Sequence, residues 1–158
     1  MVEINFVYLT QERLLELERE LKELKSNGRK EIARKIAEAR AHGDLSENAE
    51  YDAAKEEQGL FEMKIAKFER LLARVRVVDI NQYPKDKVHI LSTVNVKNLK
   101  ANKVFKYHLV SPEEADFQTG KISVTSPIGR GLMGKSLGEK VKVKVPAGLL
   151  EFEILSIE

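Results

Sequence analysis

The feature that most constrains this chain is a stretch without proline, from Thr10 to Val78, that carries two apolar stripes. The first stripe has the 3, 4, 3 spacing of a coiled-coil seam, at Leu14, Leu17, Leu21 and Leu24. Gly28 interrupts it, and the stripe resumes one position late, a local stutter, at Ile32, Ile36 and Ala39. The second stripe follows the same rule at Phe61, Ile65, Phe68, Leu72 and Val75. Each helix can bury only one stripe, so we expect the two to pack antiparallel as a hairpin. A seam that recruits a partner chain is the alternative.

The predicted first helix is long for a domain of this size. Thr10 is a suitable N-cap, and Leu9 and Leu14 stand at the positions of a hydrophobic staple. A helix from Thr10 to Ala41 would measure about 48 Å at ~1.5 Å per residue. Such a length has a purpose only if the turn between the helices must be placed far from the rest of the protein.

The chain changes character near residue 80. All four prolines follow that point, and the segments between them alternate as β-strands do. The predicted strands are VHILSTVNVKNL, VFKYHLV, KISVTS, KVKVKV and LLEFEILSI, with turns at residues 98–102 and 146–148. SPIGRGLMGK, residues 126–135, breaks the alternation and predicts a short helix or loop over one side of the sheet. We therefore predict an α+β protein, with a helical hairpin followed by a small antiparallel sheet.

Composition divides the chain and excludes several classes of protein. We place a hairpin domain at 1–80 and a sheet domain at 81–158, joined around residues 80–86. The first domain carries a net charge of −2 and the second +4. Neither value is the large positive charge that would predict a nucleic-acid binder. The chain has no cysteine, which excludes disulfides and thiolate metal sites. No signal peptide or membrane-spanning run is visible, so we expect a cytoplasmic protein without a membrane partner.

The stretch AHGDLSENAEY, residues 41–51, lies where the hairpin must turn. One interpretation is local: Gly43 would close the first helix, and Asp44 with Glu47 would form a capping box for the next. The other is chemical, because two carboxylates on one turn can hold Mg²⁺ weakly, with water and phosphate completing its shell. Leu45 favours the second interpretation, since it is apolar at the far end of a polar hairpin.

A complete active site is not expected. No third acid or histidine accompanies the pair at metal-ligand spacing, and His42, His89 and His108 read as isolated residues. The chain has no phosphate-binding loop, dinucleotide fingerprint, nucleophile elbow or zinc pattern. The two acids could instead be half of a site that another protein and its nucleic acid complete.

These residues resemble a known family. A helical hairpin with ARAHGDLSENAEY at its turn, followed by a sheet domain with SPIGRGLMGK, closely resembles the GreA-type bacterial transcript cleavage factors over essentially the whole chain. The resemblance implies a transcription elongation factor, and DNA binding is a property expected of that class. Such factors bind RNA polymerase stalled by backtracking and insert the hairpin through its secondary channel. The polymerase's own Mg-dependent site then cuts the 3′ end of the nascent RNA. The sheet domain, FKBP-like in fold, would dock at the channel rim.

The resemblance also implies roles for individual residues. Asp44 and Glu47 would be the donated catalytic and metal-binding acids, with Mg²⁺ shared with the polymerase and no tightly bound cofactor. Residues expected to contact RNA or to order the tip at 43–51 are Arg40, Asn48, Tyr51 and Lys55. Tyr51 could equally pack across the hairpin, and Arg34 and Lys35 fit either an extended RNA stripe or a solvated face. Ser126, Pro127 and Ile128 match the polymerase-docking loop, although a helix covering the core would also explain them.

Other functions remain as alternatives. A polymerase-binding paralogue with this fold could inhibit, although its more acidic tip differs from the D-L-S-E-N here. A structural or chaperone-like coiled coil would explain the hairpin but not its tip. A peptidyl-prolyl isomerase is suggested by the second domain's fold alone, which does not confer activity. We expect a monomer that activates the polymerase and is not itself an enzyme.

Overall fold

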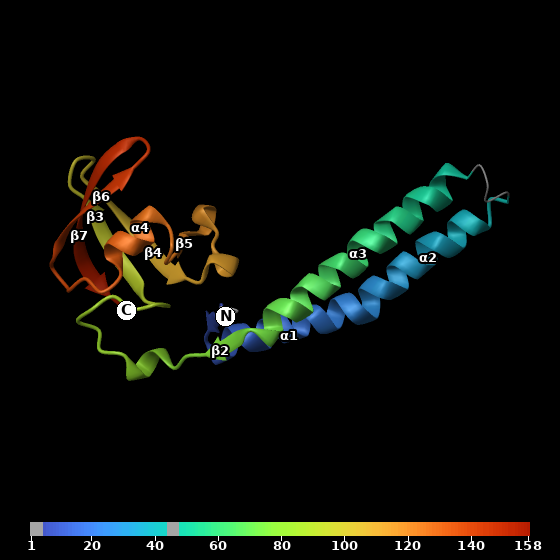
Figure 1. The fold of residues 1–158 in the computed structure, drawn as a ribbon, viewed down its shortest axis with the longest axis horizontal. Helices are drawn as coiled ribbons and strands as arrows, with labels where there is room; N and C mark the ends of the chain where they lie inside the picture. Colours follow the sequence, from blue (N-terminus) through green and yellow to red (C-terminus); the bar gives the residue numbers. More distant parts are fainter. Residues whose placement is uncertain (1–4, 44–47) are drawn as a thin grey trace, which may run out of the picture. The chain divides into compact units, whose positions relative to one another are not determined.

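The computed structural model describes residues 5–43 and 48–158. The chain forms two compact units: Glu12–Val75, and Arg76–Glu158 together with the described residues up to Gln11 (Figure 1). The first unit is helical and the second is built on a sheet, which confirms the predicted α+β class. In the described part of the chain, no helix combines the length and apolar composition needed to cross a membrane.

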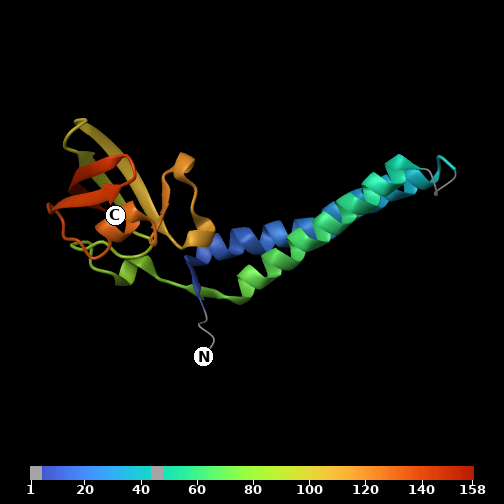
Figure 2. The same cartoon turned by 45° about the horizontal axis from the view of Figure 1, so that its top comes forward.

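The helical unit is a hairpin whose two arms lie side by side in both views (Figures 1 and 2). The first arm consists of α1 (Gln11–Glu23), a π-helical turn (Leu24–Gly28) and α2 (Arg29–Arg40). The return arm is a single helix, α3 (Ala49–Ala73). The predicted antiparallel pair of long helices is therefore confirmed.

The π turn accounts for the stutter in the first stripe. A π turn closes its hydrogen bonds over one more residue than an α turn does. The Arg29 amide accordingly bonds to the carbonyl of Leu24, five residues earlier. The backbone thus takes in one extra residue between Leu24 and Ile32 and keeps the apolar stripe facing α3.

The hairpin is held by a narrow apolar seam and by ion pairs between the arms. Its buried apolar side chains come from the two predicted stripes and from α3 near the turn: Leu17, Ile32, Ile36, Ala39, Ala54 and Ile65. Charged pairs cross from one arm to the other at Lys25–Glu69 (3.1 Å), Arg29–Glu62 (2.9 Å) and Lys35–Glu57 (2.8 Å). These pairs are exposed, so each contributes little stability.

The sheet unit contains a five-stranded sheet in the order β5-β4-β3-β7-β6. Its strands are β3 (Thr93–Asn98), β4 (Lys103–Val110), β5 (Lys121–Ser123), β6 (Lys140–Val145) and β7 (Gly148–Ile157). The predicted turns at 98–102 and 146–148 are confirmed as the β3–β4 and β6–β7 hairpins. At the first turn, the Asn98 side chain accepts bonds from the amides of Lys100 and Ala101, each at 3.0 Å.

Two details of the sheet differ from the prediction. The sheet is mixed, because β5 pairs parallel with β4. The chain between them passes through two short 3-10 turns, Pro112–Glu114 and Phe117–Thr119, and this connection lets the chain return in the same direction. Residues 88–92 are not a strand, since Leu91 has a φ of +70°, which ends any extended run. Val88 and Leu91 are buried nonetheless.

A short helix, α4 (Pro127–Leu132), covers one face of the sheet, as the SPIGRGLMGK pattern predicted. Leu132 is fully buried with Val94, Val96, Leu109, Phe152 and Ile154 of the sheet. The other small sheet joins β1 (Val7–Leu9) to β2 (Val75–Val77). The Tyr8 amide donates to the buried Ser111 hydroxyl at 3.0 Å, which ties β1 to the sheet unit.

Candidate functional site: the hairpin tip and the α4 groove

Asn48 organises the described part of the tip. It has extended backbone angles directly before α3, and its side-chain oxygen accepts the Tyr51 amide at 3.1 Å, as an N-cap does. Its amide nitrogen donates to the carbonyl of Ala39, at the end of α2, at 2.6 Å. One side chain therefore starts the return arm and ties it to the first arm. The cap of α3 is Asn48, so the capping-box explanation of Asp44 and Glu47 does not apply to this helix.

Gly43 ends the first arm as predicted. Its φ of +107° lies in the region that glycine adopts without strain. The amides of Ala41, His42 and Gly43 bond back to carbonyls of the last turn of α2. Asp44, Leu45, Ser46 and Glu47 lie outside the described residues, so the assignment of the two acids remains a prediction.

The predicted RNA-contacting residues Arg40, Tyr51 and Lys55 come together near the tip. The Arg40 guanidinium lies 5.7 Å from the centre of the Tyr51 ring, within cation–π range. Tyr51 is half-buried and packs against Ile32, Ile36 and Ala54, so it also packs across the hairpin. Arg40 and Lys55 border an open groove of about 400 Å³ whose other lining residues are Ala33, Ile36, Ala37 and Gln58. This groove has an apolar floor and a cationic rim, a combination that suits a nucleotide's base and phosphate.

Arg34 and Lys35 are engaged in ion pairs of the hairpin. Arg34 bonds to Glu31 and Glu38 on its own helix, and Lys35 pairs with Glu57 across the arms. The hydrogen bonds that Arg34 donates to the carboxylates of Glu31 and Glu38 raise the pKa of Arg34, and the bonds that Glu31 accepts from Arg34 lower the pKa of Glu31. These contacts describe the solvated helix face that was the alternative for both residues.

The described residues contain no group of three or more His, Asp or Glu side chains placed to hold a metal ion. Carboxylate oxygens are ligands that Mg²⁺ accepts, and one or two of them are its usual share in a protein site. The pair Asp44 and Glu47 therefore fits Mg²⁺ chemically only as part of a larger donor set.

The second candidate site is the α4 groove, an open apolar groove of about 370 Å³ beside α4. It is lined by Ala115, Phe117, Lys121, Ile122, Ser123, Ser126, Pro127, Ile128, Val145 and Pro146. The three predicted docking residues thus share one surface. The Ser126 hydroxyl accepts the Gly129 amide at 3.0 Å and donates to the Ser123 carbonyl at 2.6 Å, so it caps α4. Ile128 also packs on the sheet core, as the core-covering alternative requires.

Phe117 is a groove residue that the sequence prediction missed. Its side chain is 71% exposed, the largest exposure among the exposed large hydrophobic residues of the described chain. The signal was present in the sequence, because Phe117 is an apolar residue inside the polar segment EEADFQTG. Exposed aromatics beside an apolar groove are common in binding surfaces.

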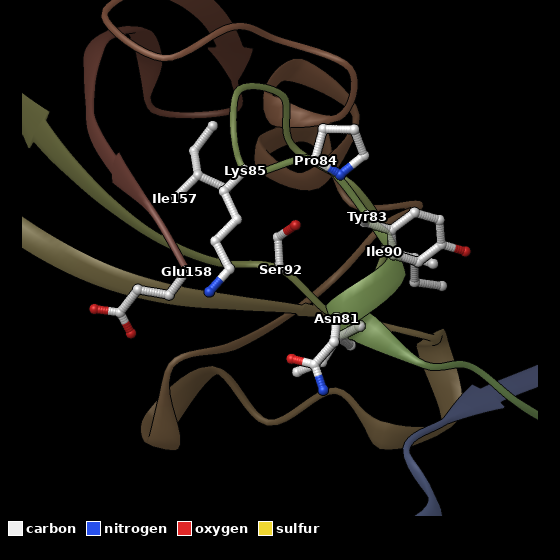
Figure 3. A pocket seen from close by; sticks show the side chains of 9 residues that line it. Asn81, Tyr83, Pro84, Lys85, Ile90, Ser92, Ile157 and Glu158 are labelled. Carbon is white, nitrogen blue, oxygen red and sulfur yellow. The ribbon is translucent and has the colours of Figure 1, made fainter.

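A third pocket is too small to be a site for a substrate. Its volume of about 30 Å³ leaves room for one or two waters. Figure 3 shows Lys85 extending through it toward Ser92 and Glu158, between Ile157 and the loop of Tyr83 and Pro84. It belongs to the packing of the loop that precedes β3.

Comparison with known proteins is consistent along the chain. Residues 7–77 match the family model for the N-terminal part of transcription elongation factors, and residues 83–158 match the model for the C-terminal part of GreA/GreB. The transcription elongation factor GreA of Chlorobium phaeobacteroides is 54% identical over 153 residues, covering 96% of each chain. That of Flavobacterium johnsoniae is 55% identical over 150 residues, covering 95% of each.

A solved structure is similar over almost the whole chain. GreA factor homolog 1 of Thermus thermophilus is 28% identical, covering 98% of this chain and 99% of its own, with a TM-score of 0.41. The family assignment rests on the two family models and on the two GreA sequences. Their identity and coverage establish that the chain belongs to the GreA/GreB family of transcription elongation factors, as a member of the GreA type.

Proposed function

We propose that this elongation factor rescues backtracked RNA polymerase by stimulating cleavage of the nascent transcript. The hairpin enters the polymerase's secondary channel, and Asp44 and Glu47 at its tip complete the polymerase's metal site beside the RNA 3′ end. The sheet unit docks at the channel rim through the α4 groove. The chain is an activator in this scheme, and the polymerase performs the bond cleavage.

The capping of α3 by Asn48 is the observation that carries the proposal. Asp44 and Glu47 had one strong structural explanation, a capping box for the return arm, and Asn48 fills that role. Asn48 also ties the start of α3 to the end of α2 through the carbonyl of Ala39. Two acids in the turn of a long hairpin are then best explained by a ligand outside this chain.

The chain's own residues would bind and orient the substrate. The carboxylates of Asp44 and Glu47 would hold a polymerase-bound Mg²⁺ and accept hydrogen bonds from the attacking water. When bound, Mg²⁺ supplies the positive charge that lowers the pKa of that water and stabilises the leaving oxygen. Arg40 and Lys55 would bind RNA phosphates while the apolar floor of the groove contacts a base, and their position on the rim of that groove supports this role.

The direct experiment replaces charge while preserving shape. Asp44→Asn and Glu47→Gln remove the anionic ligand but keep similar side chains. We expect either variant to fold and compete for polymerase normally, and to lose most of the stimulated cleavage in stalled elongation complexes. Raising the Mg²⁺ concentration should partly restore cleavage, because metal recruitment is what the variants lack. Asp52→Asn, in the exposed first turn of α3, is the matched control and should cleave normally.

Other outcomes separate the alternatives. Near-normal cleavage by both tip variants would contradict the metal role. Slower transcription without cleavage, with the unsubstituted protein, would identify an inhibitory paralogue. RNA incubated with the protein and Mg²⁺ but without polymerase should stay intact, and cutting there would show that the chain holds an active site of its own.

A further inference from the structure

Gly28 and Phe61 pack closely against each other between the two arms of the hairpin. Gly28 is the last residue of the π turn, and Phe61 lies opposite it on α3. A Cβ added to Gly28 would lie 2.4 Å from Cζ of the Phe61 ring. That is about 1 Å short of an ordinary carbon–carbon contact. Any larger residue at position 28 would therefore require the Phe61 ring or the arms that carry the two residues to shift.

The packing of the hairpin differs on the two sides of this contact. Toward the tip, Phe61 packs on the cluster of Ile32, Ile36 and Ala54. Toward the base, the arms leave a groove of about 380 Å³ beside Leu21, Ser26 and Leu72. The apolar packing of the tip half therefore begins where Gly28 meets Phe61.

The π turn itself is supported by local bonds. The Ser26 hydroxyl donates to the Lys22 carbonyl at 2.9 Å, and the Asn27 side-chain amide donates to the Glu23 carboxylate at 2.6 Å. Arg29, the next residue, pairs with Glu62 through two bonds of 2.9 Å. Such turns are rare and insert one residue into an otherwise regular helix. Here the insertion brings Gly28 onto the face that meets α3.

We propose that the π turn, seated through Gly28 against Phe61, sets the alignment of the two arms and thereby positions the tip acids. Gly28 and Phe61 are positioning residues that act through the arms and touch neither RNA nor metal. The inference rests on the proposed function of the tip. It explains why glycine, one of the poorest helix formers, stands inside this long arm.

The test compares two glycines in helical segments of the same hairpin. Gly28→Ala should lower the melting temperature, because the added methyl group collides with the Phe61 ring. Gly59→Ala, in α3, has no neighbour within 4 Å and should raise it, because alanine favours helix. Adding Phe61→Leu to Gly28→Ala should relieve the collision and recover stability. A rise in melting temperature for Gly28→Ala, equal to that of Gly59→Ala, would overturn the proposal.

Alignment can be measured without polymerase. The chain has no cysteine, so spin labels can be placed at Glu20→Cys in α1 and Glu56→Cys in α3, both exposed positions. We expect Gly28→Ala to shift the label distance by about 1 Å or more, and Gly59→Ala to leave it unchanged. An unchanged distance in Gly28→Ala would also overturn the proposal.

The effect on function is measured as the rate of RNA cleavage in stalled elongation complexes, at a saturating concentration of the elongation factor. A misplacement of about 1 Å can cost on the order of 100-fold in rate, so Gly28→Ala should lose about ten- to a hundred-fold of the cleavage while competing normally for polymerase. Phe61→Leu should restore cleavage in the same variant. Normal cleavage despite a shifted distance would refute the link to the tip. If the unsubstituted protein did not stimulate cleavage, the proposed function would fail, and the label distance would still decide the packing claim.

Discussion

Side chains at the tip have two separate roles: some hold the two arms together, and others border a groove that could take a ligand. Asn48 has a structural role, since its side-chain oxygen caps α3 and its side-chain nitrogen donates to the carbonyl of Ala39 at the end of α2. Arg40 and Lys55 are exposed and border a groove, so their contacts leave room for a ligand. Tyr51 does both, because it packs on the seam and lies beneath Arg40.

Replacing Asn48 should loosen the start of the return arm. Asn48→Ala removes the cap and the bond to Ala39, and we expect the hairpin to lose about 1–2 kcal/mol of unfolding free energy. Amide exchange at Tyr51 should rise, because its acceptor is gone. Denaturant unfolding followed by circular dichroism, with hydrogen exchange at the α3 amides, measures both effects.

Asn48→Asp is the informative comparison. Its carboxylate can still cap α3 and is favoured at a helix N-terminus, but it cannot donate to the Ala39 carbonyl. We expect an intermediate loss of stability with Tyr51 protected. Stability equal to the unsubstituted protein in Asn48→Ala would show that the tip does not depend on this residue.

At the scale of elements, a cross-strand row of half-buried residues joins three strands of the sheet through His108. His108 in β4 is paired in register with Thr93 of β3 and with Lys121 of β5. Its Nδ1 lies 3.2 Å from the Thr93 hydroxyl. Burial lowers the pKa of His108 below its ordinary 6.5, and the charge of Lys121 lowers it further, against smaller opposing effects of Ser92 and Glu114.

This row predicts how the stability of the sheet unit depends on pH. The unfolded chain binds a proton at His108 more readily than the folded chain, so stability is complete above the unfolded pKa and is lost as pH falls through the folded pKa. Unfolding free energy should therefore decrease from about pH 7.5 to about pH 5.5. Titration of the His108 ring by NMR should give a pKa below 6.5.

His108→Gln is the control for this effect, because it removes the titrating group and keeps a polar side chain. The variant should show a smaller loss of stability over the same pH range. An equal loss in both proteins would assign the pH dependence to other groups.

At the scale of the whole molecule, the sheet unit is assembled from both ends of the described chain. Val7 and Leu9 of β1 are 0% and 2% exposed, and the Tyr8 amide satisfies the buried Ser111 hydroxyl. The hairpin is therefore inserted between β1 and the rest of the unit to which β1 belongs. A fragment that begins after the hairpin lacks one of its own strands.

We expect the fragment 75–158, which keeps β2, to melt at a lower temperature than the sheet unit of the full chain, because losing β1 exposes apolar surface and leaves Ser111 without its donor. Adding a peptide of residues 5–11 should raise that melting temperature. The fragment with peptide should compete for polymerase without stimulating cleavage. A peptide with Val7→Asp is the control, and rescue by that peptide would contradict the role of β1.

The sequence by itself determined the features that depend on local periodicity. The two apolar stripes predicted an antiparallel hairpin, because each helix had only one face to bury. Period-two alternation predicted β3, β4, β5, β6 and β7, and Ser126-Pro127 marked the start of α4. The resemblance of GDLSENAEY predicted the tip acids, which remain a prediction because Asp44 and Glu47 lie outside the described residues.

Tertiary structure decided what depends on residues far apart in sequence. The stutter predicted an irregularity at Gly28, but only the tertiary structure shows that the Phe61 ring occupies the space that a side chain at position 28 would need. The parallel direction of β5 depends on the path of residues 111–120, which carries no periodic signal. The position of β1 depends on Ser111, about a hundred residues later, and no pattern in VYL specifies that partner. Local sequence specifies which face of an element is apolar, whereas the partner that covers this face is chosen by the free energy of the whole folded chain.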